Sequence, residues 1–99
     1  MGLKRKFRAK LYNQHLKNYC EVCGVAGSEF NPLDVDHVKT LGSGGTDSDY
    51  NCMTLCRAHH TEKGSLAIGG MAAKYPRYLR WLLDNDWYIC DVTNKWRHE

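Results

Sequence analysis

The chain has 99 residues, with 14 Lys and Arg against 11 Asp and Glu, and a formal net charge of +3. A hydrophobic content of 42% indicates one small globular domain and excludes a disordered chain. No apolar run approaches the roughly 18 residues of a membrane span, and the basic start MGLKRKFRAK lacks the apolar core of a secretory signal. We therefore expect an intracellular, cytoplasmic protein that does not contact membranes.

The positive charge is concentrated at the beginning of the chain. Residues 1–19 hold six of the basic side chains and no acidic one, whereas residues 20–99 hold the other 8 and all 11 acids. Basic arms usually contact nucleic acid phosphates, although a solvated helix face is an equal alternative. The apolar spacing of Phe7, Leu11 and Leu16 predicts a short helix over 7–19.

Two strands and a helix are predicted in the middle of the chain. The alternation in LDVDHVKTL predicts a strand over 33–41, and YNCMT predicts a second strand over 50–54. The turn-rich GSGGTDSD loop (42–49) joins them, so we expect antiparallel pairing. The following LCRAHHTEKG (55–64) predicts a second metal-binding turn that runs into a helix ending at Gly64.

Further helices and a hairpin are predicted towards the end of the chain. A short helix over 66–75 contains a weakening Gly-Gly pair, and Pro76 suits the first turn of a helix over 76–86. Its apolar side is expected to hold Tyr78, Leu79, Leu82 and Leu83. The segments WYICD and KWRH predict a C-terminal hairpin. The fold class is therefore small α+β.

The cysteines and histidines are spaced as metal ligands. Five Cys without an export signal argue against a disulfide framework. Cys20-x2-Cys23 and Cys56-x2-His59 are two chelating pairs, and together they complete the tetrahedral shell of a structural Zn²⁺. This interpretation is favoured over two unrelated pairs of buried thiols. Cys52 is a rival to His59 as the fourth ligand.

A second group of polar residues stands where a core would need apolar side chains. Asp36 and His37 lie in a strand-like run, Asn51 opens the second strand, and His60 follows a predicted zinc ligand. These residues converge on one face if the strands pair and the helix crosses them. A carboxylate and an imidazole can hold a divalent cation, and a separate imidazole can take a proton from water near neutral pH.

The three segments CEVC (20–23), VDHVKTLGSGG (35–45) and NCMTLCRAHHTEK (51–63) resemble the HNH endonuclease family in its zinc-bound form. The resemblance implies a ββα-metal finger stapled by zinc at residues 20–63, flanked by the arm at 1–19 and an extension at 64–99 in a single 1–99 domain. His59 departs from it, since many members have Cys there. The tail also looks like that of small phage-encoded members.

The resemblance also implies a mechanism on DNA. His37 is the general base, Asn51 positions it, and Asp36 with His60 holds a catalytic divalent metal such as Mg²⁺, Mn²⁺ or Ni²⁺. Because Asp36 and His37 are adjacent, the strand should bend there so that both reach one site. The expected phosphate contacts are Lys4, Arg5, Lys6, Arg8, Lys39, Arg57 and Lys63.

The substrate is expected to be double-stranded DNA, with weak sequence preference because no specificity domain is evident. The first alternative is a zinc-stapled nucleic-acid-binding module without catalysis, which leaves Asp36, His37 and His60 without a role. The second is a protein-interaction adaptor that uses the aromatic tail. Nicking of a plasmid distinguishes the nuclease from both.

Overall fold

The computed structural model describes residues 16–98, and its centre is an antiparallel pair of strands. β1 (Leu33–His37) pairs with β2 (Cys52–Cys56), so that Leu33 lies opposite Cys56 and His37 lies opposite Cys52. Both predicted strands form and pair antiparallel, but β1 ends at residue 37 and not 41, and β2 covers 52–56 and not 50–54, because residues 49–51 form a 3-10 turn. β1 stops at His37 because the chain bends at residues 38–39 and then enters a 3-10 turn, η1 (Leu41–Ser43). The predicted bend therefore follows His37 and does not disturb the pairing of Asp36.

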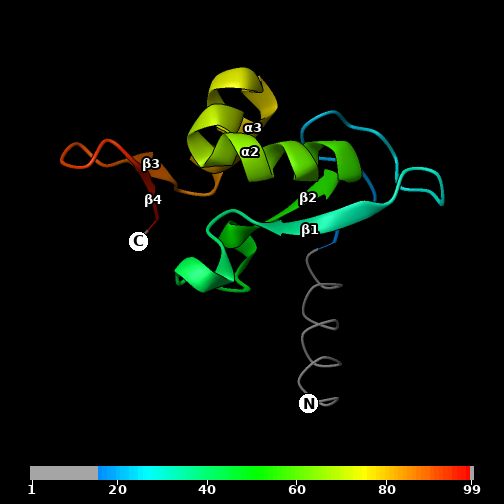
Figure 1. Cartoon of the computed structure of the whole chain (residues 1–99), viewed down its shortest axis with the longest axis horizontal. Helices are drawn as coiled ribbons and strands as arrows, with labels where there is room; N and C mark the ends of the chain where they lie inside the picture. Colours follow the sequence, from blue (N-terminus) through cyan, green and yellow to red (C-terminus); the bar gives the residue numbers. More distant parts are fainter. Residues whose placement is uncertain (1–15, 99) are drawn as a thin grey trace, which may run out of the picture.

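The helix α2 (Arg57–Lys74) follows β2 directly and crosses the strand pair (Figure 1). Its backbone breaks at Ala67, where φ is 58° and ψ is −171°, a conformation that side chains other than Gly rarely adopt. The two predicted helices are thus two halves of α2. The first half was predicted to end at Gly64, but the helix continues through Gly64 and breaks at Ala67. Glu62 accepts hydrogen bonds from Lys74 and Tyr75 and so links the halves.

α3 (Pro76–Asp84) begins at Pro76 as predicted, and it packs on α2. Tyr78 and Leu82 are fully buried, whereas Leu79 and Leu83 are 36% and 54% exposed, so the predicted apolar side is only half correct. The i, i+4 spacing turns Tyr78 and Leu82 together towards the core, and Trp81 completes that stripe in place of the two leucines. The C-terminal hairpin is confirmed as β3 (Tyr88–Ile89) and β4 (Trp96–Arg97), which pair antiparallel.

β2 is buried along its whole length because other chain elements pack around it. α2 covers one face, and the segment before β1 bonds to the edge of β2 that β1 leaves free. The backbone N–H of Glu21 donates to the carbonyl of Thr54, and the Thr54 N–H donates to the Glu21 carboxylate. The buried apolar core is made of Cys20, Val22, Val38, Met53, Leu55, Cys56, Met71, Ala72, Tyr78, Leu82 and Trp87.

The N-terminal predictions lie largely beyond this fold. The arm residues Lys4, Arg5, Lys6 and Arg8, and most of the predicted 7–19 helix, lie outside the described residues. Within residues 16–19, Tyr19 forms a β-bridge with Ala26 and is not helical. Among residues 16–98, no helix has both the length and the apolar character that crossing a bilayer requires.

Candidate metal centres and active site

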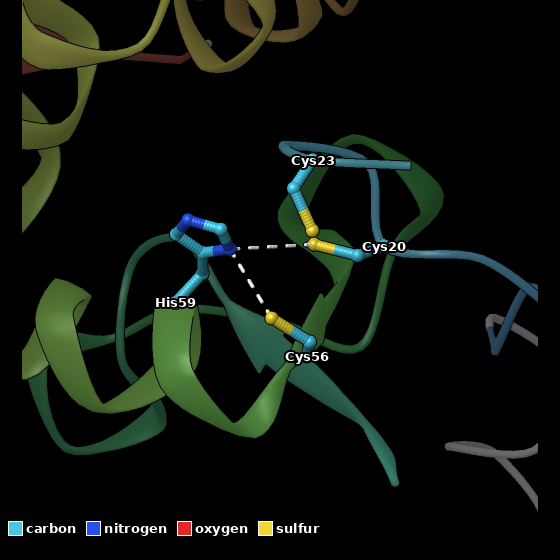
Figure 2. A group of neighbouring side chains, drawn as sticks. All are labelled: Cys20, Cys23, Cys56 and His59. Carbon is cyan, nitrogen blue, oxygen red and sulfur yellow. Dashed lines mark hydrogen bonds between the residues drawn. The ribbon is translucent and has the colours of Figure 1, made fainter. Parts of the chain in front are cut away.

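Four predicted ligands meet at the junction between β2 and α2. Cys20 and Cys23 lie on the turn that precedes β1, Cys56 ends β2, and His59 lies in the first turn of α2 (Figure 2). The three sulfur atoms and the imidazole nitrogen all lie within 4.8 Å of one another. His59 Nδ1 is 3.1 Å from Cys56 Sγ and 3.8 Å from Cys20 Sγ. The structure therefore joins the two pairs into one Cys3His cluster.

The cluster fits a tetrahedral zinc ion. Zn–S bonds of about 2.3 Å and Zn–N bonds of about 2.0 Å would place neighbouring ligand atoms about 3.5–3.8 Å apart, close to the separations seen here. Burial raises the pKa of the Cys20 thiol, but hydrogen bonds from the backbone of Cys23, Cys56 and Val22 and from His59 outweigh it and lower that pKa to about 6. Cys20 therefore favours the thiolate form that binds metal.

Cys52, the rival ligand, lies elsewhere. It stands opposite His37 in the strand pair and is absent from the cluster found among residues 16–98. Burial and the carboxylates of Asp47, Asp49 and Asp36 raise the pKa of its thiol to about 11, which disfavours the thiolate. The fourth position therefore belongs to His59, whose ring is packed edge-on against the ring of Tyr75, 4.9 Å away.

The oxygen-rich group lies on the face of β1 that α2 covers. Asp36 Oδ1 is 3.4 Å from His60 Nε2, and the other ring nitrogen of His60 is 3.3 Å from Asp34 Oδ2. Burial raises the pKa of the Asp36 carboxyl, although Lys63, His60 and His37 oppose the shift. Asp34 was not singled out in the sequence, although its i, i+2 relation to Asp36 in a strand puts both side chains on one face.

Lys63 is an internal residue and not a surface contact. It is buried, and its ammonium donates to the carbonyls of His37 and Val38 at 2.9 and 3.0 Å. It also lies 3.2 Å from Asp36 Oδ2 in an ion pair that lacks hydrogen-bond geometry. Its predicted contact with DNA phosphates stays a prediction. In this structure the Asp36 carboxylate and the carbonyls at the end of β1 hold the ammonium instead.

His37 points away from Asp36, as neighbouring residues of a regular strand do. Its Nε2 lies 2.7 Å from Asp47 Oδ1, on the loop between the two strands. Asp47 was not expected as a partner, because a loop rich in Gly, Ser and Asp gives no periodic signal. The contact fixes the orientation of the His37 ring.

Asn51 ties the two ends of the loop together. Its Oδ1 accepts a hydrogen bond from the backbone of Lys39 at 2.8 Å, and its Nδ2 donates to the carbonyls of Lys39 and Thr46 at 3.0 and 2.8 Å. A Cβ on Gly45 would lie 1.8 Å from the Lys39 carbonyl oxygen, so only glycine permits this approach. Asn51 thus fixes the backbone on both sides of the His37–Asp47 contact.

A strand pair crossed by a helix, with a Cys3His cluster at the start of that helix, defines a zinc-stapled ββα-metal fold. The family model for HNH endonuclease matches residues 20–66, just under half of the chain. Residues 20–66 are thus similar to an HNH endonuclease domain. Neither the curated proteins nor the solved structures contain a match to the chain.

Proposed function

We propose that the protein is a metal-dependent endonuclease that hydrolyses phosphodiester bonds of double-stranded DNA. The observation that carries the proposal is the pairing of Asp36 Oδ1 with His60 Nε2 at 3.4 Å within an HNH domain. Metal–ligand bonds of about 2.1 Å would separate two neighbouring ligand atoms by about 3.0–3.4 Å, so this pair suits one divalent cation.

Asp36 and His60 would hold Mg²⁺, Mn²⁺ or Ni²⁺, which would act as a Lewis acid on the scissile phosphate. Asp34, 3.3 Å from the second nitrogen of His60, would orient that ring. Lys63 would keep Asp36 ionised, because its ammonium offsets part of the cost of burying the carboxylate. With only two protein donors, the pair leaves coordination positions for water and phosphate.

His37 would act as the general base that takes a proton from the attacking water. Asp47 would stabilise the resulting imidazolium, and Asn51 would hold the backbone that carries both residues. The exposed side chains of Lys39 and Arg57 would contact flanking phosphates together with the N-terminal basic residues. Arg57 also pairs with Asp34 at 3.0 Å, so it adjoins the proposed metal ligands.

The test is nicking of a supercoiled plasmid over a Mn²⁺ titration. We expect His37→Ala to lose about 10²–10⁴ in rate at every metal concentration, as removal of a general base does. His60→Ala should also be inactive but should recover partly at high Mn²⁺, because it retains the base and loses a ligand. Thr61→Ala is the matched control on the same helix turn, with its side chain exposed.

Near-normal cutting by His37→Ala would remove His37 as the base. A wild-type protein that retains DNA but nicks nothing with Mg²⁺, Mn²⁺ or Ni²⁺ would instead be a non-catalytic, zinc-stapled binding module. Circular dichroism and zinc content of each variant separate loss of chemistry from loss of fold.

A further inference from the structure

A groove separates the loop that follows β1 from the C-terminal hairpin. Its volume is about 740 Å³, and its walls are the loop residues around Lys39, Gly45 and Asn51 and the hairpin residues 95–98. The hairpin and this loop lie at the same end of the molecule (Figure 1). The function proposed above does not use the hairpin.

Two contacts fix the walls of the groove relative to each other. Trp87 Nε1 donates to the carbonyl of Tyr50 at 2.6 Å. The rings of Tyr50 and His98 stack with their centroids 3.7 Å apart and their planes 4° from parallel. Because Tyr50 belongs to the loop and the other two residues flank the hairpin, the groove is a built feature of the fold.

The charge of the groove contrasts with that of its surroundings. Among residues 16–98, three cationic side chains line it, namely Lys39, Lys95 and Arg97, and no Asp or Glu does. Residues 16–98 as a whole hold nine basic and ten acidic side chains. All three cations are exposed, so their charges are available to an anionic ligand. Trp87, Tyr88 and Trp96 also line the groove, and cations together with aromatic rings are typical of nucleic acid surfaces.

The groove also adjoins the candidate active site. Asn51 bonds to Lys39 and to Thr46, both of which line the groove, and Thr46 is followed directly by Asp47, the partner of His37. The groove and the candidate base thus share one loop. A polyanion that reached His37 would meet this groove next.

We propose that the groove binds the backbone of the DNA duplex beside the cleaved bond, with Lys39, Lys95 and Arg97 as phosphate ligands. This inference rests on the proposed function for the identity of the ligand. It assigns to the C-terminal hairpin a role in holding substrate, since the hairpin supplies two of the three cations.

The test compares two double variants that each remove two positive charges. Lys95→Ala/Arg97→Ala strips one wall of the groove, and Arg77→Ala/Arg80→Ala removes two exposed arginines from α3, outside the groove. Binding of a short fluorescent DNA duplex is followed by anisotropy over a salt series without added divalent cation. Loss of two phosphate contacts should lower the log Kd–log salt slope by about 1.8 and weaken Kd about 10-fold or more at low salt.

Lys39→Ala tests the opposite wall of the groove and leaves the hairpin intact. We expect it to lower the log Kd–log salt slope by about 0.9. Equal slopes for the groove variant and the α3 variant would overturn the proposal. So would a single-stranded RNA that displaces the labelled duplex more effectively than the same unlabelled duplex does. This experiment measures binding and not cleavage, so the two proposals can fail separately. Slope changes in a protein that does not nick plasmid would refute only the nuclease activity. Nicking by a protein whose groove variants keep the wild-type slope would refute only DNA binding in the groove.

Discussion

His59 and His60 are neighbours in the first turn of α2, yet they face chemically different surroundings. The His59 ring meets the sulfur atoms of Cys20 and Cys56, whereas the His60 ring lies between the carboxylates of Asp34 and Asp36. Successive residues of a helix leave its axis about 100° apart, so one turn can serve two sites. A single dipeptide thus separates a sulfur-rich group from an oxygen-rich group.

The two groups also differ in how many metal ligands the protein provides. The sulfur group offers four protein ligands, which is the closed shell of a structural zinc site. In the proposed function the oxygen group would supply Asp36 and His60 as ligands, and such an incomplete shell is what catalysis on a phosphate requires. The comparison predicts that damage to the first group affects folding, and that damage to the second affects chemistry.

Cys56→Ala should have the largest effect, because it removes a ligand and a buried residue at the end of β2. Zinc binding supplies about 10–16 kcal/mol in small zinc-dependent domains, which matches or exceeds the whole stability of about 5–15 kcal/mol. We expect a largely unfolded, zinc-free chain by elemental analysis and circular dichroism. Cys90→Ala is the matched control, since Cys90 lies outside the cluster. A folded, zinc-loaded Cys56→Ala protein would refute the structural role.

Asp34→Asn should have an intermediate effect that is confined to the oxygen group. Removal of a carboxylate that orients a metal-bound imidazole typically costs about 10–100-fold in metal affinity or activity. We expect the Mn²⁺ concentration for half-maximal nicking to rise in that range, with zinc content and melting temperature unchanged. Asp91→Asn, in the exposed turn of the hairpin, is the control. An unchanged Mn²⁺ requirement would show that Asp34 serves only its ion pair with Arg57.

The smallest expected effect is a difference in how fast iodoacetamide labels the individual cysteines. It compares thiols inside the Cys3His cluster with thiols outside it. Hydrogen bonds from Thr93 lower the pKa of Cys90 to about 7, whereas burial raises that of Cys52 to about 11. At pH 8 most of Cys90 is therefore thiolate, against about one in a thousand for Cys52. Iodoacetamide followed by peptide mass spectrometry should label Cys90 first.

The same experiment follows the metal. With zinc bound, the three cluster thiols should resist labelling, and a chelator should expose them. Raising the pH from 6 to 8 should speed labelling of Cys90 up to about its pKa and then level off, while labelling of Cys52 should still increase. Rapid labelling of Cys23, Cys20 and Cys56 before chelation would contradict a zinc-bound cluster.

The sequence predicted the parts of this molecule that are set by spacing. Two short gaps identified Cys20, Cys23, Cys56 and His59, and alternation identified the first strand, because a chelating turn and a strand each depend on residues close in the chain. The break in α2 was misplaced to Gly64, since local preference says little about where packing forces a turn. Ala67 carries that turn with an unfavourable φ.

Contacts between segments that are distant in the chain could not be predicted from the sequence. Asp47 reaches His37 from ten residues away through an irregular loop, and Lys63 is drawn inward from a helix position that alone looks solvent-facing. Asp34 was within reach of strand periodicity and was missed because its partner His60 lies on another element. The groove depends on how the hairpin docks against Tyr50, which no local pattern encodes.

Cys20 and His59 are 39 positions apart in the chain, so the sulfur cluster also bears on folding. A metal ion bound by both residues closes a loop that contains β1 and β2, as a covalent crosslink would. For a loop of this length the chain entropy removed from the unfolded ensemble is about 4 kcal/mol. Pinning the ends of that loop also shortens the search that brings β1 to β2. The zinc supply is therefore expected to control how fast the chain folds as well as how stable it is.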